Sequence, residues 1–191
     1  MGTRKRNRRA IVLVHGLLIT ALIVALGACS TDGADPIAVE GTWVLDTGYY
    51  ERWIITENSI TYEGSSDGSE YTTNYEAKIV SHSNNGLNAG ETKLTGNDTE
   101  DALNPGFAVI EYTEVDGPGT GEVGKFNLFR WADNADDPSN KDFSQGYKDA
   151  TPNDDENFDT VVFDTPAEAE AEVTVANEFF ENPPSSGAVK Q

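Results

Sequence analysis

Alternation of hydrophobic and polar residues between Tyr71 and Val80 is the feature that most limits how this chain can fold. One face of the stretch carries Tyr71, Tyr75, Ala77 and Ile79, and the other carries Thr72, Asn74, Glu76 and Lys78. Successive side chains of a β-strand point to opposite faces of the sheet. The period of two therefore predicts an antiparallel strand with one buried face and one solvated face.

Similar short segments follow one another along the chain and are separated by turn-forming residues. The glycine-rich stretch 116–121 lies between two of them, so this pair is expected to form a hairpin. The expected strands are Gly41–Leu45, Arg52–Thr56, Ser59–Glu63, Tyr71–Val80, Phe107–Val115, Glu122–Trp131, Phe143–Lys148 and Asp159–Asp164, with Thr92–Thr95 as a further candidate.

The periodicity changes after Asp164. Thr165-Pro166-Ala167-Glu168 is a capping box with proline at the first helical position, which is a strong helix start. An apolar stripe at helical spacing follows, and it predicts one helix over 166–180. The stripe consists of Ala169, Val173, Ala176 and Phe180. Two prolines at 183 and 184 end the pattern, so residues 183–191 are expected to form a loose tail.

About eight short strands followed by one helix favour a closed sheet, because closure removes the exposed edge strands. We therefore predict a mainly β fold over 41–182, namely a small antiparallel β-barrel with a C-terminal helix. A two-sheet β-sandwich is the alternative.

Cys29 is the only cysteine, so no disulfide can stabilise the chain beyond it. Five of the 13 basic residues precede Cys29 and all 33 acids follow it, which leaves a net charge of −25 on the part from Cys29 onwards. Such a field opposes binding to nucleic acid. The aromatic residues, with 3 Trp, 7 Tyr and 8 Phe, are sufficient for a packed core.

The first 28 residues have the organisation of a signal peptide. Basic residues at positions 4–9 precede an uncharged apolar run, Ile11–Leu26, which is short for a membrane-spanning helix. The sequence Leu26-Gly27-Ala28-Cys29 then resembles the lipobox of bacterial lipoproteins. The resemblance implies cleavage between Ala28 and Cys29, acylation of Cys29, and export to the cell envelope. Residues 29–40 are expected to be a flexible tether, and Ser30 after the cysteine implies the outer membrane or cell surface rather than the inner membrane.

Gly41-Thr42-Trp43 at the start of the first strand resembles the Gly-x-Trp motif of lipocalins. That resemblance implies a Trp43 side chain packed over the closed end of the barrel and a helix outside it. The wider pattern, which includes Trp53-Ile54-Ile55-Thr56, is similar to small bacterial lipoproteins of uncharacterised function. It implies a fold and a location but no activity. The second and third lipocalin motifs are not evident, so ligand binding does not follow from the resemblance.

Few residues suggest a chemical site. His82 is the only histidine after Cys29 and lies in a polar run, so we expect an exposed position rather than a catalytic triad or a zinc site. The acidic stretch with Asp133, Asp136 and Asp137, and the stretch 153–157, resemble solvated loops more than calcium loops. Trp43, Trp53 and Tyr75 are candidates for lining a cavity, although filled-core packing is the more common role.

The expected function is therefore that of a lipid-anchored, non-enzymatic envelope or surface protein without a cofactor, which binds a partner protein or a small ligand or has a structural role. A carrier of apolar ligands would need an open barrel. A carboxylate-dependent hydrolase would need a cleft with two facing acids, one of them with a raised pKa. A calcium-binding surface module is a further alternative.

Overall fold

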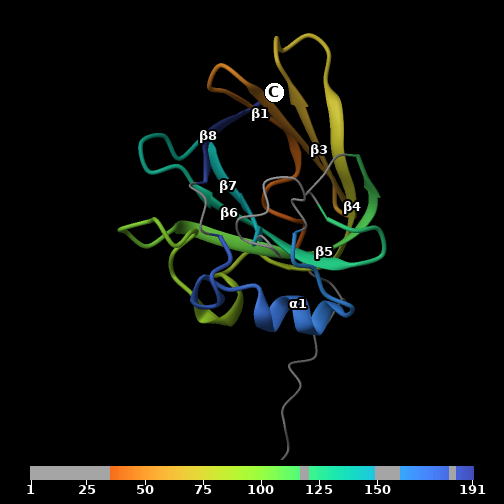
Figure 1. The fold of residues 1–191 in the computed structure, drawn as a ribbon. Helices are drawn as coiled ribbons and strands as arrows, with labels where there is room; N and C mark the ends of the chain where they lie inside the picture. Colours follow the sequence, from red (N-terminus) through yellow and green to blue (C-terminus); the bar gives the residue numbers. More distant parts are fainter. Residues whose placement is uncertain (1–34, 117–120, 149–159, 181–183) are drawn as a thin grey trace, which may run out of the picture.

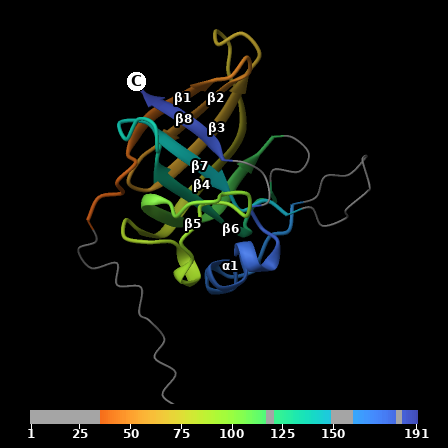
Figure 2. The same cartoon turned by 90° about the vertical axis from the view of Figure 1, so that its left-hand side faces the viewer.

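The computed structural model describes residues 35–116, 121–148, 160–180 and 184–191. Eight antiparallel strands form a closed barrel, in which each strand pairs with the next and the last pairs with the first (Figures 1 and 2). The predicted barrel is thus confirmed, in place of the alternative sandwich. The strands are β1 (Gly41–Asp46), β2 (Tyr50–Ile55), β3 (Ser59–Ser65), β4 (Thr72–Ser83), β5 (Leu103–Val115), β6 (Phe126–Asp133), β7 (Lys141–Gln145) and β8 (Ser185–Lys190).

The barrel interior is formed by alternate residues of the strands, as the period of two predicts. Tyr75, Ala77 and Ile79 of β4 are all buried there. Aromatic rings from facing strands occupy much of the space, and Phe143 packs against both Trp53, at 4.9 Å between ring centroids, and Phe129, at 5.3 Å. β4 pairs with β5 from Tyr75 to Ser83, and the register of this pairing shifts twice. Such irregularities bend the strands, which helps the sheet to close.

One end of the barrel is closed by the segment before β1. Ile37 and Val39 are 2% and 0% exposed and belong to the interior cluster. Asn84, just after β4, accepts the Ala38 N–H at 2.8 Å and donates to the Pro36 carbonyl at 2.9 Å. The prediction of a tether over 29–40 is therefore wrong for its last residues: Ile37 and Val39 supply the apolar side chains that cover this end of the interior.

The predicted loose tail is also wrong, because β8 pairs with β1 and β7 and completes the barrel. Only Ala188 of β8 is buried, so the segment carries no hydrophobic alternation that a sequence reading could detect. In the described part of the predicted strand over 159–164, residues form isolated bridges rather than a strand, and Phe163 bridges to Phe126. Val161 and Phe163 pack against the outside of the barrel instead. Thr92–Thr95 likewise lies outside the strands.

An outer layer covers β5 and β6, with α1 (Pro166–Glu172) lying against them (Figure 1). The predicted helix start is confirmed, since Thr165 is the N-cap and its Oγ1 accepts the Glu168 N–H at 3.2 Å. The helix is much shorter than predicted, and a short 3-10 turn, η2 (Val175–Asn177), follows it. Ala176 of the predicted stripe is exposed, whereas Ala169, Val173 and Phe180 are buried against Phe107, Val109 and Leu128.

The early end of α1 has a physical cause. Glu91 accepts the Val175 N–H at 2.9 Å, and Thr174 caps η2 by accepting the Asn177 N–H at 3.2 Å. These side chains provide acceptors outside a continuous helix. Phe180 reaches the barrel from a turn with a positive φ of 58°. Among the described residues, no helix is long and apolar enough to cross a membrane.

Arg130 of β6 lies at the centre of the outer layer and its side chain is fully buried. It donates to Asn88 Oδ1 through Nε at 2.9 Å, pairs with Glu91 Oε2 at 2.5 Å, and lies 3.8 Å from the centre of the Phe180 ring. Asn88 in turn donates to the Val173 carbonyl at 2.8 Å. Burial lowers the pKa of Arg130, and the Glu91 carboxylate opposes that shift. We refer to Arg130, Asn88, Glu91 and Phe180 as the Arg130 network.

Candidate functional site

The predicted anchor, Cys29 with its cleavage position after Ala28, lies outside the described residues, as does the acidic stretch 153–157. The other sequence candidates are all described. Gly41 and Trp43 lie at the closed end of the barrel, and His82 lies near the end of β4. Asp133, Asp136 and Asp137 lie at the end of β6 and in the loop that follows it.

The Gly41–Trp43 motif has a packing role. Trp43 is 3% exposed, and its indole N–H donates to the Val39 carbonyl at 2.8 Å, which holds the end-covering segment in place. Gly41 has a φ of 134°, and a Cβ there would meet Lys190 Cε at 2.5 Å. The Lys190 side chain passes this point, and its Nζ lies 5.5 Å from the Trp43 ring centre. The position of Trp43 therefore agrees with what the lipocalin resemblance implies.

His82 also has a structural contact. Its Nε2 lies 3.0 Å from the Asp35 carbonyl oxygen, which ties the end of β4 to the segment before β1.

The loop after β6 uses its carboxylates to shape itself. Asp133 pairs with Lys141 across the loop and accepts the Asn104 amide at 2.7 Å. Asp137 accepts the Ser139 hydroxyl at 2.7 Å and the Ser139 N–H at 3.0 Å, and these hydrogen bonds lower its pKa. In the described part of the chain, no three acidic, histidine or cysteine side chains gather as a metal site would require.

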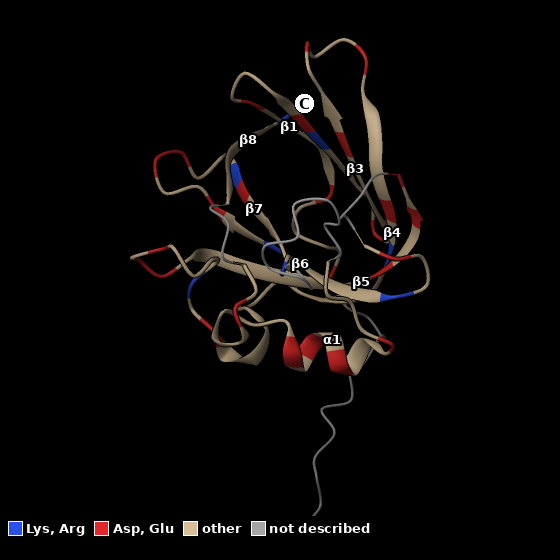
Figure 3. Cartoon of the chain, in the orientation of Figure 1, with Lys and Arg blue, Asp and Glu red and all other residues tan. Residues whose placement is uncertain are grey.

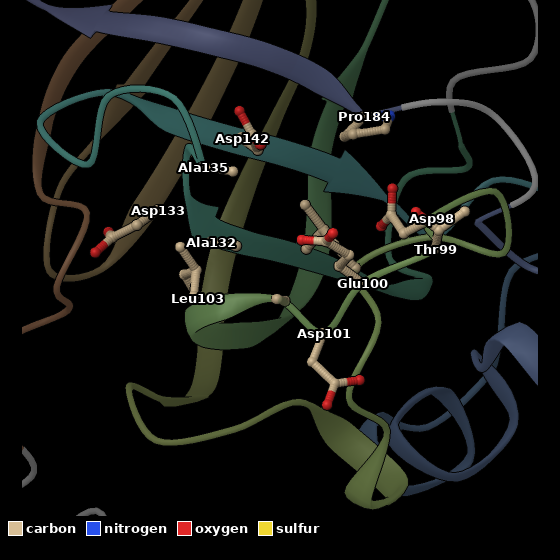
Figure 4. A pocket seen from close by; sticks show the side chains of 12 residues that line it. Asp98, Thr99, Glu100, Asp101, Leu103, Ala132, Asp133, Ala135, Asp142 and Pro184 are labelled. Carbon is tan, nitrogen blue, oxygen red and sulfur yellow. The ribbon is translucent and has the colours of Figure 1, made fainter.

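An acidic groove of about 260 Å³ lies beside this loop, between the 94–103 segment and the outside of β6 and β7. Asp98, Glu100, Asp101, Asp133 and Asp142 contribute carboxylates, which are spread around the groove rather than converging on one point (Figure 4). Asp142 accepts Ser186 Oγ and the Gly187 N–H, both at 2.8 Å, and so fixes β8. Acidic residues also cover α1 and many loops (Figure 3), so the groove does not stand out by charge.

The barrel axis offers little empty space. Tyr75, Tyr112, Phe129, Trp131 and Phe143 are at most 1% exposed and fill it together with Ile55, Ile60 and Ile110. The open interior that a carrier of large apolar ligands needs is therefore not found among the described residues.

A smaller hollow opens at the other end of the barrel, where β2 begins and β7 ends. This mouth pocket has a volume of about 220 Å³, and its main lining residues are Glu51, Trp53, Tyr62, Phe129, Phe143 and Gln145. The register explains the opening. Phe143 of β7 pairs with Ser185, the first residue of β8, so the pairing of these two strands stops before β7 ends. Ser185, where the pairing of β7 and β8 stops, and Tyr147, just after β7, also line the pocket.

Three tyrosines extend from the pocket into the interior. The rings of Tyr62 and Tyr75 lie 5.5 Å apart, and those of Tyr75 and Tyr112 lie 5.4 Å apart. Burial raises the pKa of all three, so their hydroxyls remain protonated and can donate. Tyr62 donates to Glu51 Oε1 at 2.6 Å, and the Tyr112 oxygen accepts from Gln145 Nε2 at 2.6 Å.

Tyr75 differs from its two neighbours. It is 0% exposed, and its hydroxyl has no hydrogen-bond partner within the described ranges. Burial is the main cause of its raised pKa, and Tyr112, Tyr62 and Glu51 add smaller contributions. A buried hydroxyl without a partner costs about 1–3 kcal/mol. A water molecule or a ligand in this region would remove that cost.

The sequence pointed to part of this site. Trp53 lines the pocket as one of the three aromatic candidates, whereas Trp43 and Tyr75 are core residues. Glu51 was not foreseen as a site residue, since it is one of 33 acids. Its alternation with Trp53 and Ile55 on β2 was the available signal, because that alternation turns Glu51 toward the interior.

Neither the family models nor the curated proteins nor the solved structures contain a match to this chain.

Proposed function

We propose that this protein is a lipid-anchored, non-enzymatic protein of the bacterial envelope or surface that holds a small ligand in the mouth pocket. One observation carries the binding part of the proposal: the pocket combines aromatic walls with the Glu51 carboxylate, whose Oε2 has no hydrogen bond or ion pair among the described residues. Ligand sites commonly have mostly apolar walls and a few polar groups that orient the ligand. The anchoring part rests on the lipobox-like sequence at Leu26–Cys29.

The lipocalin-like arrangement supports the same proposal. Trp43 and the preceding segment close one end of an eight-stranded barrel, and the pocket opens toward the other end. Eight-stranded barrels have an interior that side chains fill or that holds one small ligand. Here the ligand is a small one, because aromatic side chains take up most of the interior.

A hydrolytic function has less support. The acidic groove spreads its carboxylates, and three of its five acids are engaged in hydrogen bonds or an ion pair. Outside this groove, Asp67 and Asp137 have lowered pKa values because of hydrogen bonds from Ser69 and Ser139. A general acid needs a shift in the opposite direction.

Binding can be tested by titrating a library of small neutral and charged fragments into the isotope-labelled full chain in detergent and following backbone and side-chain NMR signals. The proposal predicts that the fragments which bind shift signals of Trp53, Tyr62 and Gln145. A library whose binders act only on the acidic groove, or a library without binders, would contradict the proposal.

Anchoring can be tested with Cys29→Ala, with Ser30→Ala as the matched control. The lipobox reading predicts that Cys29→Ala abolishes incorporation of labelled fatty acid and membrane association, whereas Ser30→Ala retains both. Partitioning of the Cys29→Ala protein into the detergent phase to the wild-type extent would show that no lipid is attached at this position.

A further inference from the structure

The charge of Glu51 is the starting point for identifying the ligand of the mouth pocket. Glu51 Oε1 accepts the Tyr62 hydroxyl, while Oε2 has no hydrogen bond or ion pair in the described part of the chain. The comparable acid on the next strand, Glu63, is paired with Arg52. A carboxylate at a partly buried position without a cation is costly, so the pocket favours a positively charged occupant.

The aromatic walls favour the same charge. The Trp53 and Tyr62 rings are stacked with centroids 5.5 Å apart, and Phe143 and Phe129 continue the wall beyond Trp53. The face of an aromatic ring is negative and attracts cations, whereas it repels anions. The carboxylate and the rings therefore both favour a cation. A neutral apolar molecule would leave the charge of Glu51 without a partner.

The polar groups also distinguish between kinds of cation. Glu51 lines the pocket, and its Oε2 is a free acceptor among the described residues. This oxygen calls for an N–H donor, which a primary ammonium group has and a quaternary ammonium group lacks. The volume of about 220 Å³ is below the range of drug-sized ligand sites, so the alkyl part must be short.

We propose that the mouth pocket binds a small primary alkylammonium ion, with the ammonium group at Glu51 and the alkyl chain against Trp53 and Phe143. This proposal rests on the proposed binding function and specifies the chemistry of its ligand. The net charge of −25 in the part of the chain from Cys29 onwards would raise the local concentration of any cation, so specific binding must be separated from this general attraction.

The test uses isothermal titration of the full chain in detergent at 0.15 M NaCl, which restricts general charge effects to about 8 Å. The compounds are n-butylammonium, the neutral n-butanol, the anionic butyrate and tetramethylammonium. We expect saturable 1:1 binding of n-butylammonium with a dissociation constant of about a millimolar or lower. n-Butanol and tetramethylammonium should bind at least about tenfold more weakly, because each lacks either the charge or the N–H donor. Butyrate should not bind.

Glu51→Gln should weaken n-butylammonium binding at least about tenfold and leave n-butanol binding unchanged. Glu63→Gln is the matched control, because Glu63 pairs with Arg52 and does not line the pocket, and it should change neither affinity. Tyr62→Phe keeps the charge and frees Glu51 Oε1, so it should retain or strengthen n-butylammonium binding; this variant keeps the proposal testable if Glu51→Gln does not fold.

Three results would overturn this inference. Equal binding of n-butanol and n-butylammonium would show that charge is not recognised, and the proposed ligand-binding function would stand without it. Equal binding of tetramethylammonium would show that the N–H donor is not recognised. An n-butylammonium affinity that is unaffected by Glu51→Gln, or absent in the wild type, would remove Glu51 as the recognition group.

Discussion

Phe129 and Arg130 are neighbours on β6, yet they face two polar regions of opposite character. Phe129 lines the mouth pocket, where Glu51 Oε2 lacks a hydrogen bond or ion pair among the described residues. Arg130 centres a network in which the guanidinium, Asn88 and Glu91 all have partners. A network with all its hydrogen bonds made rigidifies a structure, whereas a partly satisfied one leaves binding capacity. The comparison therefore supports the proposal that the outer layer stabilises the fold and that the pocket binds a ligand.

The strongest test of this assignment is Arg130→Met. It leaves Asn88 Oδ1 and the largely buried Glu91 carboxylate without their main donor, so the free energy of unfolding should fall by about 3–5 kcal/mol. Urea denaturation measures the loss. Arg52→Met is the control, because the Arg52–Glu63 pair is partly exposed and should contribute less than about 1 kcal/mol. Equal losses in the two variants would mean that the Arg130 network has no special role.

Phe180→Ala extends the test to the packing of the outer layer. Phe180 is 1% exposed and covers the Arg130 guanidinium, so its truncation should cost about 3 kcal/mol or more. Ala176→Gly is the comparison. Because Ala176 is exposed, this substitution should lower the free energy of unfolding by about 1 kcal/mol or less. A loss below about 1 kcal/mol for Phe180→Ala, on the scale of that control, would indicate that the segment after α1 does not stabilise the barrel.

Two substitutions inside the barrel compare a tyrosine whose hydroxyl has no partner in the described ranges, Tyr75, with one whose hydroxyl is hydrogen-bonded, Tyr112. Tyr75→Phe removes a buried hydroxyl without a partner, so stability should be unchanged or slightly increased. Tyr112→Phe loses the hydrogen bond from Gln145 and should cost about 0.5–1.5 kcal/mol. Thermal unfolding in the absence of ligand measures both. A Tyr75→Phe variant as destabilised as Tyr112→Phe would mean that Tyr75 already has a partner.

Salt should have a small and graded effect on the melting temperature, because it screens exposed charges and does not act on the Arg130 network or the barrel interior. Eight basic residues cannot neutralise 33 acids beyond Cys29, and about 1 M NaCl shortens the screening length to about 3 Å. The melting temperature should rise gradually with any monovalent salt as repulsion between acids falls. A melting temperature that is flat in NaCl but rises at millimolar calcium would instead support a cation site at Asp133–Asp137.

The sequence predicted the barrel well because its signal is local. Alternation at Tyr75, Ala77 and Ile79 and the N-cap at Thr165 each determine structure within a few residues, and both are confirmed. Segments whose structure depends on distant partners were missed. β8 is a strand because β1 and β7 need a partner, and Val175 leaves the helical path because Glu91, 84 residues away in sequence, accepts its N–H.

The mouth pocket could be predicted only in part for the same reason. Trp53 could be named from its aromatic character, but the pocket also depends on where β8 begins, and that position has no sequence signal. Glu51 differs from Glu63 because the neighbouring Arg52 pairs with Glu63 and leaves Glu51 without a cation among the described residues. The relevant property is a missing partner, which a single sequence does not display.

The most direct test of the central assignment uses the three tryptophan indole N–H signals of the protein. Trp53 lines the pocket, the Trp43 indole is bonded to the Val39 carbonyl at the closed end, and the buried Trp131 is not among the pocket residues. Titration with n-butylammonium should shift the Trp53 signal saturably and leave the other two in place. An unmoved Trp53 signal, or shifts of equal size at Trp43 and Trp131, would contradict the assignment of ligand binding to the mouth pocket.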